Sequence, residues 1–201
     1  MSLKLYYVPQ TRAGRVRFVL EELGVPFELL RMEAKDTKSP EYLKVNPLGH
    51  VPALVDGDTT VIESAAICMY LADKFLEKKL APPPGTPERA AYYQWIVYAM
   101  VSLEPVLVVY GQHTQRFAEA DRSNATAEWA KKRFDDVAAV ADAHVKGREF
   151  LVGNHFTVAD VVMAGVVGFG RMMGLMGGHP NLDAYAKGIY AREAGKKARA
   201  D

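Results

Sequence analysis

The sequence predicts an α/β domain at the N-terminus, followed by an all-helical domain. Over the first third of the chain, the patterns follow the order strand, helix, strand and then strand, strand, helix. Residues 80–87 interrupt this order, because four prolines and a glycine in eight residues continue neither a helix nor a sheet. Only long amphipathic stretches follow. We therefore expect an α/β domain at 1–79, a linker at 80–87 and a helical bundle domain at 88–201.

The first two strands and the helix between them form one unit. Residues 3–8 and residues 27–32 have strand patterns. Between them, apolar residues recur at helical spacing from Gly14 until Gly24 and Pro26 end the helix. The unit is short enough for a single right-handed crossover between parallel strands.

The second half of this domain is a hairpin that leads into a helix. Two β-prone runs flank Asp56-Gly57, which is a strong signal for a tight turn. The second run ends at Glu63-Ser64, where helical spacing begins and continues to about Leu76. Upstream, Ser39 and Pro40 predict the start of a short helical turn. The order βαβ followed by ββα matches the thioredoxin-like fold, a mixed sheet with helices on both faces.

The corner at Glu63-Ser64 has the properties of a binding site for an amino-acid group. The Ser64 hydroxyl can cap the following helix, whose first N–H groups and dipole favour an anion, and Glu63 offers a negative charge. An ammonium and a carboxylate on one ligand would each find a partner here. Pro52 has no N–H to donate and is compatible with a cis bond, which leaves the Val51 backbone for an extended peptide. Taken singly, each residue also fits a structural role.

Together these residues resemble the glutathione-binding half of the soluble glutathione S-transferases. The resemblance rests on NPLGHVPAL at 46–54, ESAAI at 63–67 and YLA at 70–72. Thr157 and Asp160 are similar to the helix-capping motif of that family's second domain, and the run 180–185 is also similar, so the resemblance covers nearly the whole chain. It implies an enzyme that adds the thiolate of glutathione to small hydrophobic electrophiles. Glutathione is then a co-substrate, and no prosthetic group is expected.

The resemblance also assigns roles along the bound tripeptide. Glu63 and Ser64 would hold the γ-glutamyl end, and Val51, followed by Pro52, would pair with the cysteinyl backbone. His50 stands where relatives often have a basic residue that meets the glycine carboxylate. As a neutral imidazole it would act there as a hydrogen-bond donor.

Such an enzyme has to favour the thiolate, because a free thiol has a pKa near roughly 8.5. Thr11 stands two residues after Pro9 and matches the family's catalytic serine, so it is expected to donate a hydrogen bond to the sulfur. Arg12 replaces the reactive cysteine of some relatives, and its cation would favour the thiolate electrostatically. Tyr6 and Tyr7 are alternative hydroxyls, of which strand alternation lets only one face the ligand. A helix cap is the structural alternative for Thr11.

The first helix after the linker is expected to line the pocket for the electrophile. The candidates are Tyr98, Val101 and Tyr110, and all three also fit core packing. Cys68 lies among apolar helix residues and is expected to be a buried small hydrophobe instead of a nucleophile. The histidines show no spacing typical of a metal site.

The composition indicates a soluble cytoplasmic protein. Lys+Arg 25 against Asp+Glu 24 gives a net charge of +1, so no nucleic-acid or membrane partner is indicated. The chain starts without a basic-then-apolar leader and has no run of eighteen uncharged apolar residues. A single cysteine agrees with a reducing compartment.

The resemblance implies a homodimer and leaves two alternative functions. One is a glutathione-dependent isomerase or dehalogenase of the same fold, although Gln10-Thr11-Arg12 lacks the Ser-Ser-Cys of maleylacetoacetate isomerases. The other is a non-catalytic protein that binds glutathione or a partner, and the Glu63-Ser64 pair argues against it.

Overall fold

The computed structural model describes residues 3–200 and divides into two compact units. Residues up to Ala81 and those from Tyr190 onward form the first unit, and Pro82–Ile189 form the second. The division falls inside the proline-rich segment at 80–87. Met1, Ser2 and Asp201, which belong to the expected leaderless start and to the expected end of the helical domain, lie outside the described residues.

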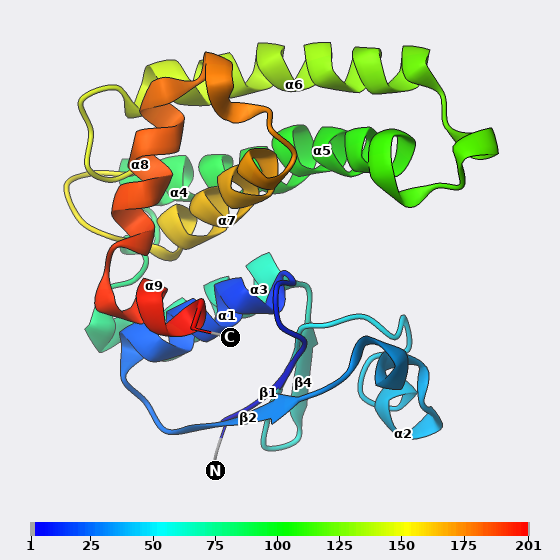
Figure 1. The fold of residues 1–201 in the computed structure, drawn as a ribbon. Helices are drawn as coiled ribbons and strands as arrows, with labels where there is room; N and C mark the ends of the chain where they lie inside the picture. Colours follow the sequence, from blue (N-terminus) through cyan, green and yellow to red (C-terminus); the bar gives the residue numbers. More distant parts are fainter. Residues whose placement is uncertain (1–2, 201) are drawn as a thin grey trace. The chain divides into compact units, whose positions relative to one another are not determined.

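The first unit is built on a four-stranded mixed sheet with the strand order β2-β1-β3-β4 (Figure 1). Its strands are β1 (Leu3–Tyr7), β2 (Phe27–Arg31), β3 (Ala53–Asp56) and β4 (Thr59–Ile62). The pair β1 and β2 is parallel, with Leu5 opposite Leu29, whereas β3 is antiparallel to both β1 and β4. Leu5 and Leu54 are completely buried in the core of the sheet. This topology confirms the predicted thioredoxin-like fold.

The helices of this unit are α1 (Ala13–Leu23), η1 (Ala34–Lys38), α2 (Pro40–Leu43), α3 (Ser64–Lys74), η2 (Leu76–Lys78) and α9 (Glu193–Ala198). Of these, α1, α2 and α3 begin close to the residues predicted, and η1, η2 and α9 were not predicted. Gly24 ends α1 with a φ of 65°, a conformation that favours glycine. At the start of α2, the Ser39 hydroxyl accepts the Tyr42 N–H at 3.2 Å, as predicted. Figure 1 shows α1, α3 and α9 grouped together, with α2 apart from them.

The hairpin turn lies one residue later than the sequence predicts. Because Asp56 still pairs with Thr59, the turn residues are Gly57 and Asp58. The Asp56 carboxylate also accepts hydrogen bonds from Tyr70 and Lys74 of α3, and these bonds hold its pKa below the usual value. These contacts from a later helix fix Asp56 at the strand end.

The C-terminal helix α9 packs against α1, so the structure differs from the expectation that residues 88–201 form one helical domain. The rings of Phe18 and Tyr190 lie 5.7 Å apart. Gly195 permits the close approach, because a Cβ there would lie 3.0 Å from Cζ of Phe18 in α1. Helical periodicity predicts which face of a helix is buried but does not say which domain buries it. Sequence reasoning therefore assigned this segment to the helices that precede it.

The regular secondary structure among the described residues of the second unit is all helical. Its main helices are α4 (Pro87–Val97), α5 (Glu104–Gly111), α6 (Asn124–Val145), α7 (Val158–Met172) and α8 (Pro180–Tyr190), of which α8 ends in the first unit. Shorter segments are the π-helices η3 (Tyr98–Leu103) and η4 (Gln112–Arg116) and the 3₁₀ turns η5 (Glu119–Asp121) and η6 (Met176–Gly178). Pro105 lies in the first turn of α5, directly after η3, so the helix changes from π to α type at Glu104 but is not interrupted there.

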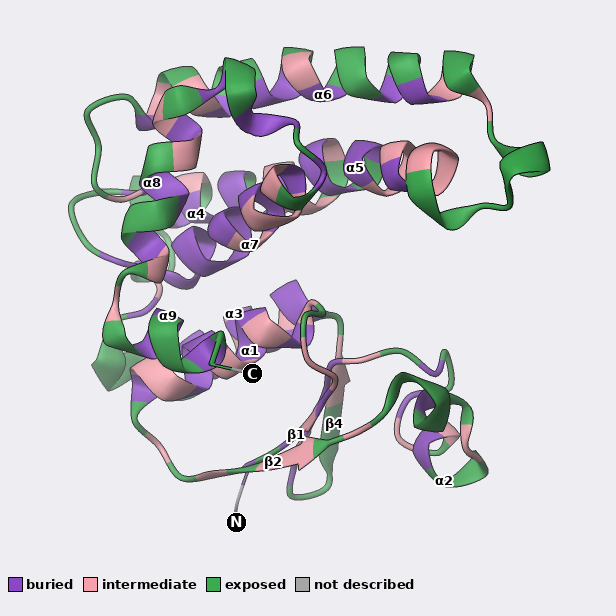
Figure 2. Ribbon diagram, viewed as in Figure 1, coloured by how far each residue is buried: buried purple, intermediate pink, exposed green. Residues whose placement is uncertain are grey.

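The helix α7 is the core of this unit. Figure 2 shows it buried along most of its length, whereas α6 is buried on one side and exposed on the other. The predicted capping box of Thr157 and Asp160 is present at the start of α7. Asp160 also accepts hydrogen bonds from the Leu151 N–H at 2.7 Å and from the Tyr185 hydroxyl at 2.6 Å. The carboxylate thus ties three segments of the unit together.

Among the described residues, one continuous helical stretch, Pro87–Arg116, is long and apolar enough to cross a membrane. In its most apolar window, 44% of the residues are buried inside the structure. Core helices of helical domains have the same length and composition, so this stretch is weak evidence for a membrane span.

Candidate functional site

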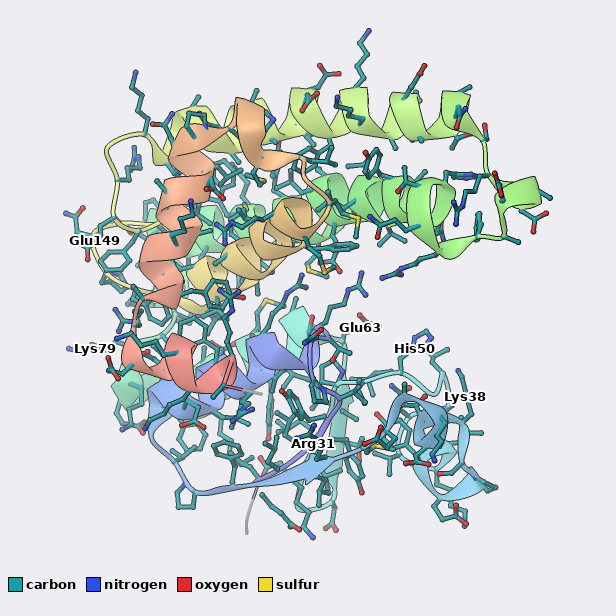
Figure 3. The ribbon with its side chains drawn as sticks, in the orientation of Figure 1. Arg31, Lys38, His50, Glu63, Lys79 and Glu149 are labelled. Carbon is teal, nitrogen blue, oxygen red and sulfur yellow. The ribbon has the colours of Figure 1, made fainter. Side chains whose placement is uncertain are left out.

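The residues predicted to bind glutathione all lie in the first unit. Thr11 and Arg12 lead into α1, residues 50–52 precede β3, and Glu63 and Ser64 stand where β4 meets α3. Figure 3 shows Glu63 at the start of α3, and His50 near α2. The fold therefore gathers, in one unit, residues that lie up to about fifty positions apart in the sequence.

The start of α3 differs from the expectation in one respect. Glu63 occupies the N-cap position, and Ser64 is the first helical residue, so Ser64 is not the N-cap that the sequence predicts. The Glu63 side chain is exposed and forms no capping hydrogen bond. The first turn of α3 is thus not capped by Glu63, and its N–H groups suit an anion. The Ser64 hydroxyl instead accepts a hydrogen bond from Nη1 of Arg15 at 3.3 Å.

The backbone of Glu63 is in an uncommon conformation. Its φ is 70° and its ψ is 115°, values that residues with a side chain rarely adopt. Such backbone strain tends to occur at functional sites, where the surrounding structure maintains it.

This strain predicts a gain in stability for one substitution. Glu63→Gly is expected to raise the free energy of unfolding by about 0.5–1 kcal/mol. Glycine adopts a positive φ without strain, and the strain relieved in the folded state exceeds the stability lost because glycine makes the unfolded chain more flexible. Glu63→Gln removes the same charge but keeps the strain, so its effect should stay within about 0.5 kcal/mol. Urea unfolding of both variants measures the difference. A Gly variant less stable than the Gln variant would contradict the assignment of strain.

Two side chains donate hydrogen bonds to the loop before β3. The Val51-Pro52 peptide bond is cis, and the His50 carbonyl accepts hydrogen bonds from the Tyr42 hydroxyl and from Nδ2 of Asn46, both at 2.6 Å. Burial raises the pKa of Tyr42 to about 12, so the phenol remains a donor at neutral pH. The His50 side chain is exposed and Val51 is half-buried, so both can be reached by a ligand.

Lys38 is a second basic residue next to this loop, and sequence reasoning missed it. Its Nζ donates to the Leu48 carbonyl at 2.8 Å. A Cβ at Gly49, whose φ is 60°, would lie 2.8 Å from the same Nζ. Figure 3 shows Lys38 and His50 near one another beside α2. No local signal distinguishes this lysine from the others in the polar run that contains it.

Thr11 lies at the predicted place, and its hydroxyl already has partners. It donates to the Val8 carbonyl at 2.7 Å and accepts the Ala13 N–H at 3.3 Å. The side chain is exposed, and Arg12, which follows it, occupies the N-cap position of α1. A hydrogen bond from Thr11 to a ligand would replace the bond to Val8.

The two tyrosines of β1 lie on opposite faces of the sheet, as alternation predicts. Tyr7 is 1% exposed, and its hydroxyl accepts a hydrogen bond from Nη1 of Arg17 at 3.4 Å. Tyr6 is half-buried, and its ring packs 5.2 Å from that of Tyr42. Of the two hydroxyls, that of Tyr7 is directed into the unit, toward Arg17.

Cys68 is completely buried one turn after Ser64. Burial raises the pKa of its thiol to about 12, although the charge of Arg15 acts in the opposite direction. The thiol is therefore protonated at neutral pH, as a structural cysteine should be.

The candidates for the electrophile pocket lie in the second unit. The Tyr98 hydroxyl donates to the Val137 carbonyl at 2.8 Å, and burial raises its pKa. Val101 is 67% exposed in η3, and Tyr110 is half-buried in α5. Tyr98 thus has a structural hydrogen bond, whereas Val101 presents its side chain to the outside. Within residues 3–200, no group of three His, Cys, Asp or Glu side chains is arranged to hold a metal ion.

Comparison with known proteins identifies the family. Residues 1–73 match the model of the glutathione S-transferase N-terminal domain, and residues 90–193 match that of the C-terminal domain. A glutathione S-transferase of Xanthomonas campestris is 30% identical over 190 residues, which cover 94% of this chain and 93% of that protein.

Solved structures agree in fold over nearly the whole chain. A sphingomonad glutathione S-transferase complexed with glutathione is 29% identical, with a TM-score of 0.85 over 98% of this chain and 97% of that one. A bacterial beta-class glutathione S-transferase of Sphingomonas chungbukensis is 27% identical, with a TM-score of 0.84 and the same coverage. Since both domains match and the Xanthomonas relative spans nearly the full length, the chain belongs to the glutathione S-transferase family.

Proposed function

We propose that the protein conjugates the thiolate of glutathione to small apolar electrophiles, and that it does so in the cytoplasm, as a homodimer and without a prosthetic group. The start of α3 is the observation that supports this most. There the exposed carboxylate of Glu63 adjoins a helix start suited to an anion, a pairing that fits the ammonium and carboxylate of a γ-glutamyl group. The sphingomonad relative was solved with glutathione bound.

In this proposal the tripeptide lies extended along the first unit. Its γ-glutamyl end meets Glu63 and Ser64, and its cysteinyl backbone pairs with Val51. The glycine carboxylate reaches His50, with the ammonium of Lys38 beside it. The Lys38 ammonium and the His50 imidazole both lie on the α2 side of the site. This side therefore suits the glycine carboxylate, the second carboxylate of glutathione.

The sulfur then lies by the turn before α1. Thr11 donates a hydrogen bond to it, and the charge of Arg12 and the N-terminus of α1 lower the pKa of the thiol. The thiolate electron pair forms the new carbon–sulfur bond, and a halide leaves with the bonding pair when the electrophile is an organic halide. Of the three candidates for the electrophile pocket, Val101 is the most exposed.

A second candidate function is glutathione binding without catalysis. It is favoured by the hydrogen bond that the Thr11 hydroxyl donates to the Val8 carbonyl, because catalysis would need the same hydroxyl proton for a hydrogen bond to the sulfur. Retention on a glutathione column combined with a conjugation assay on an aryl halide distinguishes the two. Retention with turnover supports the transferase, retention without turnover supports the binder, and loss of retention contradicts both.

Ser64→Ala tests the location of the site. It is expected to weaken glutathione binding about tenfold, because one hydrogen bond to a charged group contributes about 1.5–3 kcal/mol. Thr59→Ala removes an exposed hydroxyl of the same unit and should leave the affinity unchanged. Isothermal titration with glutathione measures both. Equal affinities for Ser64→Ala and the unmodified protein would contradict the assigned site.

A further inference from the structure

Arg15 connects the two helix starts that form the proposed site. It lies one turn after Thr11 on α1, is only 4% exposed, and reaches Ser64 of α3 with Nη1 at 3.3 Å. The two residues are 49 positions apart in the sequence, and α1 packs against α3 along the sheet. The Arg15 side chain therefore joins α1 to the corner assigned to the γ-glutamyl carboxylate.

The direction of this hydrogen bond decides what the Ser64 hydroxyl can do. A guanidinium only donates hydrogen bonds, so the Ser64 oxygen has to accept. A serine hydroxyl has one hydrogen and two lone pairs, and with one lone pair engaged its own proton points to another acceptor. A carboxylate at the start of α3 would be such an acceptor. Without the bond from Arg15, the hydroxyl would be free to rotate before binding, and this freedom would be lost on binding.

The positive charge of Arg15 and the dipole of α3 both favour an anion at the start of α3. A guanidinium remains protonated at every accessible pH, and its burial reduces screening by water. The thiol of Cys68, one turn after Ser64, also experiences the charge of Arg15. The positive charge thus lies beneath the first turn of α3, where it adds to the positive end of the helix dipole.

We infer that Arg15 is a positioning residue for glutathione: it orients the Ser64 hydroxyl as a donor to the γ-glutamyl carboxylate. The inference rests on the proposed function and extends it. Arg15 acts through Ser64, so its removal should affect recognition of one carboxylate and leave the chemical step unchanged.

The experiment compares glutathione with γ-aminobutyryl-cysteinylglycine, which lacks only the α-carboxylate of the γ-glutamyl group. Arg15→Met is expected to weaken glutathione binding and raise KM about tenfold, with kcat at saturation within about twofold. Binding of the analogue should change by less than about twofold. The double variant Arg15→Met with Ser64→Ala should bind glutathione as tightly as the single variant that binds it less tightly, because both substitutions remove the same interaction.

Arg89→Met is the matched control. Arg89 is 5% exposed in the second unit and donates to the Pro82 carbonyl at 2.9 Å, so its loss also removes a buried guanidinium. It should reduce stability without changing the affinity for glutathione. If Arg15→Met does not fold, Arg15→Lys decides the question, since lysine keeps the positive charge and can still donate a hydrogen bond. It should lose less affinity than Ser64→Ala and should also leave the analogue unaffected.

The outcomes separate this inference from the proposed function. Unmodified protein that fails to bind glutathione overturns both. Binding by the unmodified protein, with Arg15 variants that bind glutathione equally well, overturns only the role of Arg15. Equal losses for glutathione and the analogue, or additive losses in the double variant, also overturn it, because they would indicate a general structural effect.

Discussion

Asp160→Ala is expected to lower the free energy of unfolding by about 3–5 kcal/mol, because it leaves several buried donors without an acceptor. The carboxylate is 0% exposed in the core of the second unit. It accepts hydrogen bonds from the Leu151 N–H, the Thr157 N–H and hydroxyl, and the Tyr185 hydroxyl, at 2.6–3.1 Å. Burial raises the pKa of the Asp160 carboxyl, and these donors oppose the rise.

Differential scanning calorimetry measures the effect as a fall in Tm of about 10 °C or more for a chain of this length. Tyr185→Phe removes only one of the four donors and should lower the free energy of unfolding by about 1 kcal/mol. Asp136→Ala, at an exposed position of α6, is the control and should remain within about 0.5 kcal/mol. An Asp160→Ala variant as stable as the control would show that the four hydrogen bonds contribute little.

The Asp160 cluster also shows what the sequence does and does not predict. The bond to Thr157 spans three residues and follows from a local capping pattern, so it was predictable. The bonds to Leu151 and Tyr185 depend on how a loop and a later helix pack on α7. The same distinction holds for the fold. Strands, caps and the proline boundary are local signals, whereas the docking of α9 on α1 is a tertiary contact.

The site divides in the same way. A carboxylate next to a hydroxyl at the start of a helix predicts a binding corner at Glu63-Ser64, because both groups lie on adjacent residues. The backbone of Glu63 was not predictable, since a positive φ is uncommon for glutamate, and Glu63 takes the N-cap position that was expected for Ser64. The partner of Ser64 comes from a different helix, and no periodic pattern indicates Arg15. Spatial pairing over long sequence separations is what the structure adds.

Thr11→Val is expected to raise the pKa of bound glutathione by about one unit and to reduce conjugation at neutral pH about tenfold. A hydrogen bond from a hydroxyl to a charged sulfur contributes about 1.5–3 kcal/mol, or roughly one to two pKa units. The lower value applies here, because the Thr11 hydroxyl gives up its 2.7 Å bond to Val8 when it turns to the sulfur. Thr11→Ser keeps the hydroxyl and should keep the thiol pKa.

The measurement is a pH titration of the thiolate absorbance of the bound tripeptide, together with the pH profile of kcat. A raised thiol pKa shifts the rise of kcat to higher pH, since the thiolate then forms later. Thr60→Val, an exposed position on β4, is the control and should not move the profile. An unchanged pKa in Thr11→Val would exclude Thr11 as the group that stabilises the thiolate.

Arg12 then becomes the stronger candidate, and ionic strength separates the two mechanisms. A hydrogen bond between Thr11 and the sulfur is short-range and is little affected by salt. Stabilisation by the charge of Arg12 acts over several ångströms and is screened by mobile ions, with a Debye length of about 10 Å at 0.1 M salt. If Arg12 dominates, the thiol pKa should rise with added salt in the unmodified protein, and Arg12→Met should abolish that dependence. If the thiol pKa does not depend on salt and rises only in Thr11→Val, the Thr11 hydroxyl is the group that stabilises the thiolate.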